Sequence, residues 1–200
     1  MSILRMYNPW ALLLLIITSY LIGGISSSYI IGKKLSGKDI RTLGSGNAGA
    51  TNALRSFGKK AASAVLICDL LKGTVSTLIG YKFGGTDMAY ICAFFAVLGH
   101  TFPVFLKFKG GKGVATSLGA AIALNGIFAS AVVTIGLIII IRTRKVSLGA
   151  ITGEICFLLL TWLNGVRGIP LIFTTMFVLL VVYSHRGNIK RLLDGTERRI

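Results

Sequence analysis

Apolar stretches long enough to cross a lipid bilayer recur along this chain, and they constrain its fold more than any other feature. A helix needs roughly 20 mostly apolar residues to cross about 30 Å of hydrocarbon. Apolar residues make up 54% of the 200 positions, whereas charged residues make up only 14%. A soluble domain of this size could not bury so much apolar surface. The sequence therefore predicts an all-α polytopic membrane protein, with one domain over residues 1–200.

Hydropathy along the chain predicts seven transmembrane helices. The predicted spans are residues 10–31, 61–81, 88–106, 114–124, 127–141, 147–162 and 169–185. The continuous apolar run 114–141 is too long for one ordinary crossing and short for two, so we divide it at Asn125-Gly126, a turn signal. The fourth and fifth spans are then only about 17 and 23 Å long at 1.5 Å per residue. Such short spans need shielding by neighbouring helices or a locally thinned membrane.

The distribution of positive charge supports this division, because cytoplasmic loops of membrane proteins are enriched in Lys and Arg. With seven spans, 18 of the 22 Lys and Arg residues fall on one face: seven after the first span, three after the third, three after the fifth and five in the tail. The other face holds Arg5, Lys82 and Arg167, and Lys72 lies inside a span. The pattern predicts an amino terminus outside and a carboxyl terminus in the cytoplasm.

The formal net charge of +16 would suggest a nucleic-acid partner if the protein were soluble. In a membrane protein, basic loops set the topology and contact anionic lipid headgroups. We therefore expect membrane lipid as a partner and no nucleic acid.

The first basic inner loop combines glycine with small polar residues, a composition suited to phosphate binding. It runs from Arg41 to Asn52, and Arg55 follows it. Its glycines allow backbone N–H groups to turn toward an anion. No Gly-Lys-Ser/Thr sequence follows at the spacing of a nucleotide P-loop. Taken alone, a flexible connecting loop explains the composition about as well as a binding site does.

The second inner loop is a more specific signal for anion binding. Three lysines surround the pair Gly110-Gly111, and the next helix is predicted to begin at Gly113 or Val114. The amino terminus of that helix would point its partial positive charge and free N–H groups at the same place. The alternative is a Gly-Lys turn that contacts only lipid phosphates. Pro103 should end or kink the third span near the inner interface.

A third, dispersed set of polar residues lies near the inner ends of the last two spans: Ser147, Gly149, Glu154, His185, Asn188 and Arg191. A carboxylate in an apolar segment costs several kcal/mol unless it is paired, so Glu154 should find a basic or hydrogen-bonding partner in the bundle, and a Lys or Arg of an inner loop is the preferred one. Asp69 and Lys72 can meet on one face of the second span. For His100 and His185, a hydrogen-bonded interface position explains each residue alone as well as a catalytic one.

Three motifs together resemble those of the bacterial acyl-phosphate-dependent glycerol-3-phosphate acyltransferases, the PlsY family. They are the stretches 44–52, 99–116 and 185–197, which follow one another in the same order as in the family, and the resemblance spans nearly the whole chain. The resemblance implies transfer of an acyl group from acyl phosphate to the 1-hydroxyl of glycerol 3-phosphate, giving 1-acyl-glycerol 3-phosphate (lysophosphatidic acid) and phosphate in phospholipid biosynthesis. It also implies a multi-pass protein of the bacterial cytoplasmic (inner) membrane whose active site faces the cytoplasm.

The same resemblance implies two substrates, acyl phosphate and glycerol 3-phosphate, and a peripheral enzyme that produces acyl phosphate is a further candidate partner. We expect no cofactor and no metal, because the sequence contains no cluster of metal-ligating residues. The glycine-rich second motif of the family is associated with glycerol phosphate binding, and the serine and arginine of its first motif with catalysis. The arginine corresponds to either Arg41 or Arg55.

The residues assigned by motif and position fall into three groups. The expected catalytic residues are Ser45, Arg55, Lys112, His185 and Asn188. The expected substrate-binding residues are Arg41, Asn47, Thr51, Asn52, His100, Lys107, Gly110, Gly111, Gly113, Thr116 and Ser147. The expected structural residues are Asp69, Lys72 and Glu154.

An acyl phosphate is already an activated mixed anhydride, so the protein needs mainly to align the attacking hydroxyl and stabilise developing charge. No covalent acyl-enzyme is required. Phe105 lies five residues after His100, and Lys190 five after His185, so the His-x4-Asp dyad of other glycerolipid acyltransferases is missing. The proton acceptor remains open between His185, His100 and a phosphate oxygen of the substrate.

Two other classes of function fit the hydropathy. A transporter or flippase for a phosphorylated or lipid anion also uses helix amino termini at glycine-rich breaks. It would need polar residues near the membrane midplane, where only Asp69 and Lys72 are candidates. A non-catalytic lipid-binding scaffold would not require two histidines and ordered glycine turns.

Overall fold

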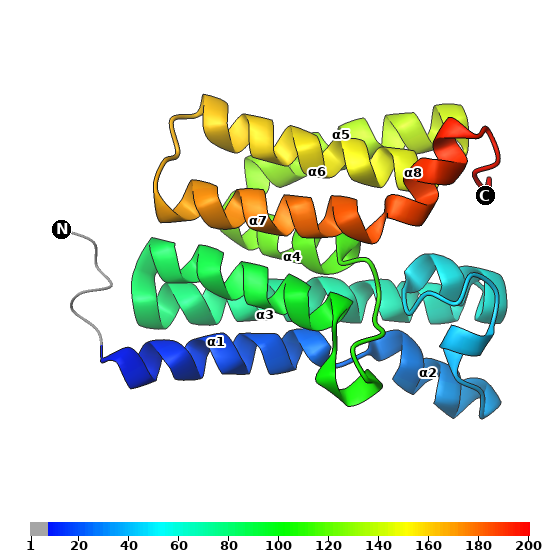
Figure 1. The fold of residues 1–200 in the computed structure, drawn as a ribbon, viewed down its shortest axis with the longest axis horizontal. Helices are drawn as coiled ribbons and strands as arrows, with labels where there is room; N and C mark the ends of the chain where they lie inside the picture. Colours follow the sequence, from blue (N-terminus) through cyan, green and yellow to red (C-terminus); the bar gives the residue numbers. More distant parts are fainter. Residues whose placement is uncertain (1–7) are drawn as a thin grey trace.

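The computed structural model describes residues 8–200 as an elongated bundle of helices (Figure 1). The α-helices are α1 (Pro9–Gly24), α2 (Ser27–Ser36), α3 (Ala50–Thr101), α4 (Val114–Leu124), α5 (Gly126–Thr143), α6 (Val146–Leu163), α7 (Ile169–Ser184) and α8 (Arg186–Leu193). Two short 3₁₀ helices, η2 (Ile40–Thr42) and η3 (Val104–Leu106), lie in the loops. No strand occurs in residues 8–200, and Arg5, predicted on the outer face, lies outside the described residues.

The long element α3 reverses direction within its length. Gly85 has φ 67° and ψ −164°, a backbone conformation that is essentially restricted to glycine. Two arms, the stretches 59–84 and 86–101, therefore run antiparallel on either side of it (Figure 1), and Gly58, with φ 80° and ψ −177°, makes a further break near the start of α3. The arms pack closely, since a Cβ on Gly80 would lie 2.6 Å from the carbonyl oxygen of Met88. The arms account for the predicted spans 61–81 and 88–106.

The predicted span 10–31 is wrong as one continuous helix. α1 ends at Gly24, and α2 begins at Ser27 after a break. At the break, the Ser26 hydroxyl accepts a hydrogen bond from the backbone N–H of Tyr29 at 3.4 Å. Serine favours this capping position because its oxygen satisfies an N–H group that has no partner within the helix.

The carboxyl end of the predicted span 88–106 is also wrong, because α3 stops at Thr101. The ring of Pro103 disfavours helical backbone at the preceding residue. Phe102 accordingly has φ −125° and ψ 63°.

The predicted division at Asn125 is confirmed as a break between two helices. Asn125 ends α4 and also caps α5, because its side-chain oxygen accepts a hydrogen bond from the backbone N–H of Phe128 at 3.1 Å. The predicted bounds of the last four spans lie within two residues of α4, α5, α6 and α7.

Close backbone approach holds α1 and α4 against α3. A Cβ on Gly23 of α1 would lie 2.0 Å from the carbonyl oxygen of Ala96, and a Cβ on Gly119 of α4 would lie 2.0 Å from that of Leu70. Small residues at such contacts are typical of helix packing in membranes, where apolar surface alone drives no association. A buried cluster that includes Phe94, Phe157 and Phe177 fills the space beside these helices.

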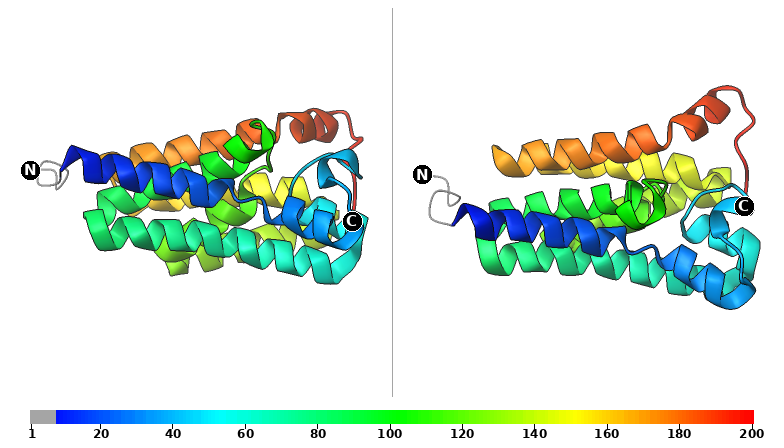
Figure 2. Two further views of the ribbon diagram at one scale, coloured as in Figure 1. Left: turned by 90° about the horizontal axis from the view of Figure 1, so that it is seen from below. Right: turned by 60° about the horizontal axis from the view of Figure 1, so that its bottom comes forward.

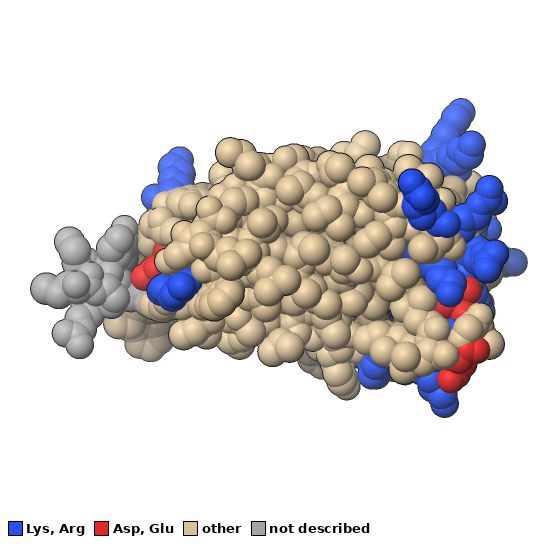
Figure 3. All heavy atoms as spheres, turned by 90° about the horizontal axis from the view of Figure 1, so that it is seen from above, with Lys and Arg blue, Asp and Glu red and all other residues tan. Residues whose placement is uncertain are grey.

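The distribution of charge is that of a multi-pass membrane protein. Lys and Arg gather at the end of the bundle that holds α2, α8 and the carboxyl terminus, and a broad middle zone carries no charged side chain on the face shown (Figure 3). Four helical stretches are long and apolar enough to cross a membrane, and a fifth is added if α7 and α8, which meet at 59°, are counted together. α4 is a shorter apolar helix. Two further views show the same elongated bundle (Figure 2).

Candidate active site

A pocket of about 950 Å³ collects polar residues from three separate breaks between helices. They come from the loop before α3, the loop before α4, and the α7–α8 junction with the tail that follows it. All five predicted catalytic residues line the pocket: Ser45, Arg55, Lys112, His185 and Asn188. It is also lined by seven other predicted residues: Asn47, Thr51, Asn52, Asp69, His100, Gly113 and Ser147. Ser45 and Arg198, which are 153 positions apart in the chain, thus line one pocket.

The remaining predicted residues lie outside the lining of this pocket: Arg41, Lys72, Lys107, Gly110, Gly111, Thr116 and Glu154. Arg41 instead forms an ion pair within the first loop and a hydrogen bond to the second loop. Its Nη2 lies 2.6 Å from Asp39 Oδ2, and its Nη1 donates to the carbonyl oxygen of Leu106 at 2.9 Å. The hydrogen bond from Arg41 lowers the pKa of Asp39. Arg55, by contrast, is exposed and lines the pocket.

The side chain of Asn52 organises the first loop. Its Nδ2 donates to three carbonyl oxygens at 3.0–3.1 Å, those of Ile40, Leu43 and Asn47. Its Oδ1 accepts from the backbone N–H of Ser45 at 2.9 Å. The amide is buried and its polar atoms are engaged, so Asn52 shapes the loop that presents Ser45.

The pair Gly110-Gly111 packs against the end of α3. The N–H of Gly110 donates to the carbonyl oxygen of Thr101, and that of Gly111 to the carbonyl oxygen of His100. A Cβ on Gly111 would lie 2.1 Å from His100 Nε2, so a larger residue would collide with the imidazole. The residues of this loop that line the pocket lie instead at the start of α4, where Gly113 caps the helix without a side-chain hydrogen bond. Those first N–H groups lack acceptors within the helix and suit an anion.

A chain of hydrogen bonds connects the second loop to the carboxyl-terminal tail. Lys112 Nζ donates to Asn188 Oδ1, and Asn188 Nδ2 donates to Glu197 Oε1 at 2.6 Å. The same carboxylate accepts from Ser147 Oγ at 2.7 Å and from Arg191 Nε at 2.8 Å. Glu197 therefore fixes which way the Asn188 amide points, with its oxygen toward Lys112.

Glu197 is a site residue that the sequence assignment omitted, although it closes the third motif. The signal available was an acidic residue in a tail that is otherwise strongly basic. Burial alone would raise the pKa of Glu197, but hydrogen bonds from Ser147, Asn188 and Arg191 lower it. It remains a carboxylate at neutral pH.

Burial lowers the pKa of Lys112 to about 8; nearby Glu197 opposes the shift, whereas Arg191 and Arg55 add to it. At neutral pH most Lys112 side chains therefore carry a positive charge that is only partly hydrated. Such a cation is well suited to a phosphate group, because the attraction is weakly screened.

His185 lies at the 59° bend between α7 and α8 and is almost fully buried. Its Nδ1 is 2.8 Å from the carbonyl oxygen of Val181. A carbonyl oxygen can only accept, so Nδ1 carries a hydrogen, and Nε2 of the neutral ring keeps its lone pair. The arrangement provides a group that can accept a proton within the pocket.

The second histidine, His100, belongs to a buried charged cluster on α3. Asp69 Oδ1 lies 2.8 Å from Lys72 Nζ and 3.6 Å from His100 Nδ1, and it accepts from Ser27 Oγ at 2.7 Å. Lys72 Nζ also donates to the carbonyl oxygen of Ile25 at 2.9 Å. The predicted contact between Asp69 and Lys72 is confirmed, and it joins α3 to the break between α1 and α2.

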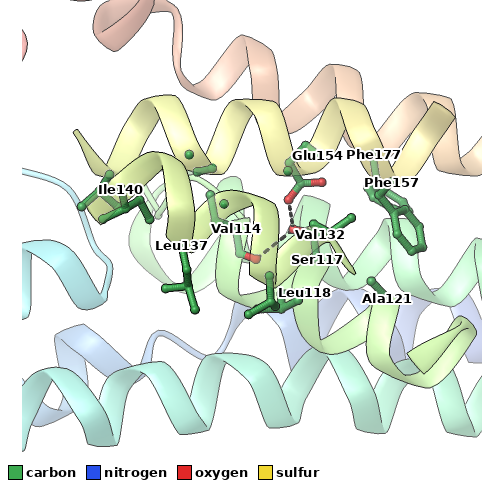
Figure 4. A pocket seen from close by; sticks show the side chains of 16 residues that line it. Val114, Ser117, Leu118, Ala121, Val132, Leu137, Ile140, Glu154, Phe157 and Phe177 are labelled. Atoms are coloured by element: carbon green, nitrogen blue, oxygen red, sulfur yellow. Dashed lines mark hydrogen bonds between the residues drawn. The ribbon is translucent and has the colours of Figure 1, made fainter. Parts of the chain in front are cut away.

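A second pocket, of about 170 Å³, lies among α4, α5, α6 and α7 and is almost entirely apolar (Figure 4). It shares part of its lining with the polar pocket: Val114, Leu118, Leu137, Ile140, Val146 and Ala150. Glu154 lies in its wall and accepts a hydrogen bond from the Ser117 hydroxyl. The preferred Lys or Arg partner for Glu154 is therefore wrong, whereas the alternative, a hydrogen-bonding partner within the bundle, is confirmed by the Ser117 hydroxyl of the facing helix.

Comparison with known sequences identifies close relatives along nearly the whole chain. A family model described as glycerol-3-phosphate acyltransferase matches residues 13–195. The glycerol-3-phosphate acyltransferase of Thermoanaerobacter sp. (strain X514) is 45% identical over 184 residues, which cover 92% of this chain and 93% of the relative. That of Bacillus subtilis (strain 168) is 42% identical over 187 residues, which cover 94% and 96%.

The fold is similar to that of a solved integral membrane glycerol 3-phosphate acyltransferase, PlsY (YgiH). Its glycerol 3-phosphate form superimposes with a TM-score of 0.91 at 41% identity, covering 95% of this chain and 96% of that one. Its lysophosphatidic acid form gives a TM-score of 0.87 at 39% identity, covering 95% of both chains. From sequence and fold together, this chain belongs to the glycerol-3-phosphate acyltransferase family.

Proposed function

We propose that this protein transfers an acyl group from acyl phosphate to the 1-hydroxyl of glycerol 3-phosphate, releasing 1-acyl-glycerol 3-phosphate and inorganic phosphate. The observation that carries the proposal is the junction of two pockets. One pocket combines Lys112, Arg55 and the start of α4, and the other is apolar and shares part of its lining. An acyl phosphate fits this pair of pockets, because its anionic phosphate suits the polar pocket and its alkyl chain suits the apolar one. The substrate and product forms of the solved relative favour the same acceptor and product.

In the reaction, the oxygen of the 1-hydroxyl attacks the carbonyl carbon of the acyl phosphate. The bond from that carbon to the phosphate oxygen breaks, and inorganic phosphate leaves. We assign phosphate binding to Lys112, Arg55 and the first N–H groups of α4, which counter the charge of the two substrates. Arg55 is preferred to Arg41, because the guanidinium of Arg41 already binds Asp39 and a loop carbonyl.

We assign the proton from the attacking hydroxyl to His185 Nε2, whose lone pair is available because Nδ1 donates to Val181. The Ser45 hydroxyl, on the exposed first loop, would donate to the oxyanion that forms at the carbonyl. Asn188 would hold Lys112 in place through the hydrogen bond to its Oδ1. Alignment of the two substrates is the main task of such a site, since acyl phosphate is already activated.

We also assign seven crossings to the chain, with the amino terminus outside and the carboxyl terminus in the cytoplasm. The reversal of α3 at Gly85 and the break at Asn125 support this count. The basic end of the bundle would then face the cytoplasm of a bacterial inner membrane, where glycerol 3-phosphate is available. An enzyme that produces acyl phosphate could approach the same face.

The test uses purified protein with palmitoyl phosphate, with and without glycerol 3-phosphate. We expect phosphate release and lysophosphatidic acid formation only when both substrates are present. His185→Ala and Lys112→Ala should lower the rate strongly while inserting into membranes normally. Failure to release phosphate in any lipid, combined with uptake of glycerol 3-phosphate into vesicles, would favour a transporter instead.

A further inference from the structure

The apolar pocket has a defined deep end. Val114 and Ile140 lie at the end that it shares with the polar pocket, and Ala121, Phe157 and Phe177 lie at the opposite end (Figure 4). The same order holds along α4, α5 and α6, because the residues shared with the polar pocket lie toward the basic end of each helix. The pocket therefore runs from the candidate site into the apolar part of the bundle.

The length of this pocket is on the scale of an alkyl chain. Along α6, the lining extends from Val146 at the shared end to Phe157 at the deep end. These residues are eleven positions apart, which corresponds to about 16 Å at 1.5 Å per residue. Continuity with the phosphate-binding residues favours the acyl chain of the donor as occupant, an assignment that rests on the proposed function.

The wall between the two ends offers almost no polar surface to such a chain. Its polar side chains, Ser117 and Glu154, hydrogen-bond to each other, and the Ser117 hydroxyl also lies 2.9 Å from the carbonyl oxygen of Val114 (Figure 4). The Ser117 hydroxyl and Oε1 of Glu154 are therefore already engaged, and a chain can pass these two atoms without leaving either unpaired.

We propose that Phe157 and Phe177 limit the length of the acyl chain that the enzyme transfers. Their ring centroids are 5.9 Å apart with 33° between the ring planes, and their side chains are 2% and 0% exposed. Both rings belong to the largest buried cluster, so neither can move aside without repacking its neighbours. Each added methylene gains burial until the chain reaches the rings, and a longer chain must displace them.

The test measures kcat/KM for acyl phosphates from decanoyl to stearoyl, as phosphate release that depends on glycerol 3-phosphate. Phe157→Ala lengthens the pocket, and we expect the ratio of stearoyl to dodecanoyl kcat/KM to rise about tenfold. Ala121→Leu fills the same deep end and should lower that ratio by a similar factor. Phe94→Ala is the matched control, because Phe94 is a buried ring of the same cluster that does not line the pocket.

Retained activity with an unchanged ratio in Ala121→Leu and Phe157→Ala would overturn the proposal, as would an equal shift in Phe94→Ala. If Phe157→Ala does not fold, Ala121→Leu alone tests the proposal. A lower ratio of stearoyl to dodecanoyl kcat/KM would support it, and an unchanged or higher ratio would overturn it. A change in copurified lipid without a change in the ratio would identify the pocket as a lipid site and would also overturn it. Absence of release from the unmodified protein with every chain length would instead contradict the proposed function.

Discussion

Lys112 provides a direct link between burial and pH dependence. Its pKa of about 8 means that the amine loses its positive charge as the pH rises through the mildly alkaline range. We predict that kcat/KM for glycerol 3-phosphate declines above about pH 8 for this reason. An arginine stays protonated throughout this range, so Lys112→Arg should lose the alkaline decline even if its maximal rate is lower. Rates measured between about pH 6.5 and 9.5 provide the test.

Lys112→Met completes the comparison, because it removes the charge at every pH. Its kcat/KM should be about 100-fold lower than that of the unmodified protein, a typical cost for losing one group that stabilises transition-state charge. An alkaline decline that persists unchanged in Lys112→Arg would show that another group titrates.

Glu197 acts on the site through Asn188 rather than by contact with the reacting atoms. Its carboxylate accepts hydrogen bonds from Ser147, Asn188 and Arg191. We predict that Glu197→Gln lowers kcat/KM about tenfold, because an amide of either orientation leaves at least one of these three donors without its acceptor. Asp194→Asn, at an exposed acid of the same tail, is the control and should be near neutral.

A second measurement must distinguish orientation of Asn188 by Glu197 from simple stabilisation of the tail. If Glu197 only stabilised the tail, Glu197→Gln would lower the amount of folded protein and leave the kcat/KM of the folded fraction unchanged. If it orients Asn188, the pH profile should change as well, because the environment of Lys112 is altered. An unchanged profile with full activity would contradict the positioning role.

Among the helices, the cluster around Asp69 is the contact whose loss should be most damaging. Asp69 and Lys72 are both buried and form an ion pair. Lys72 also donates a hydrogen bond to the carbonyl oxygen of Ile25 at the break after α1. Lys72→Met leaves a buried carboxylate without its cation, which we predict destabilises the folded state by about 3–5 kcal/mol. Thermal unfolding in detergent measures the change.

Two further variants separate the loss of the ion pair from the loss of a lysine. Asp69→Leu combined with Lys72→Met removes both charges and should recover much of the stability. Lys82→Met removes an exposed lysine from the same arm of α3 and should change stability by less than about 0.5 kcal/mol. Equal losses in Lys72→Met and Lys82→Met would rule out the buried pair as the cause.

Helix positions were predictable because hydropathy reports directly on what can cross a bilayer. The break at Ser26 was not predictable from hydropathy. The mean hydropathy of the span is high, and it does not reveal that Ser26 caps a helix that begins within the span. The site was predictable at the level of loops, where Gly, Lys and His gather at three breaks. The individual contacts of the site were not predictable. Arg41 forms an ion pair with Asp39, and Glu154 accepts a hydrogen bond from Ser117 of a different helix. Such pairings depend on how helices pack, which spacing along the chain does not encode.

For the whole molecule, the separation of charge between its two ends carries a topological consequence. The basic end holds α8 and the carboxyl terminus (Figure 3). The reversal of α3 and the α6–α7 loop lie at the other end (Figure 1). The short pair α4 and α5 decides the count, because two crossings there keep the tail on the side opposite the α3 reversal, and one crossing would bring both to the same side.

Cysteine labelling can distinguish these two topologies. In a variant whose three native cysteines are replaced, Lys82→Cys lies near the α3 reversal and Lys190→Cys lies on α8; both positions are exposed. We predict that a membrane-impermeant maleimide labels Lys82→Cys in intact bacterial cells, and that it labels Lys190→Cys only after the membrane is opened. The reason is that seven crossings place the basic end in the cytoplasm. If both cysteines were labelled in intact cells, α4 and α5 would form one crossing, and the three polar breaks could not all face the cytoplasm.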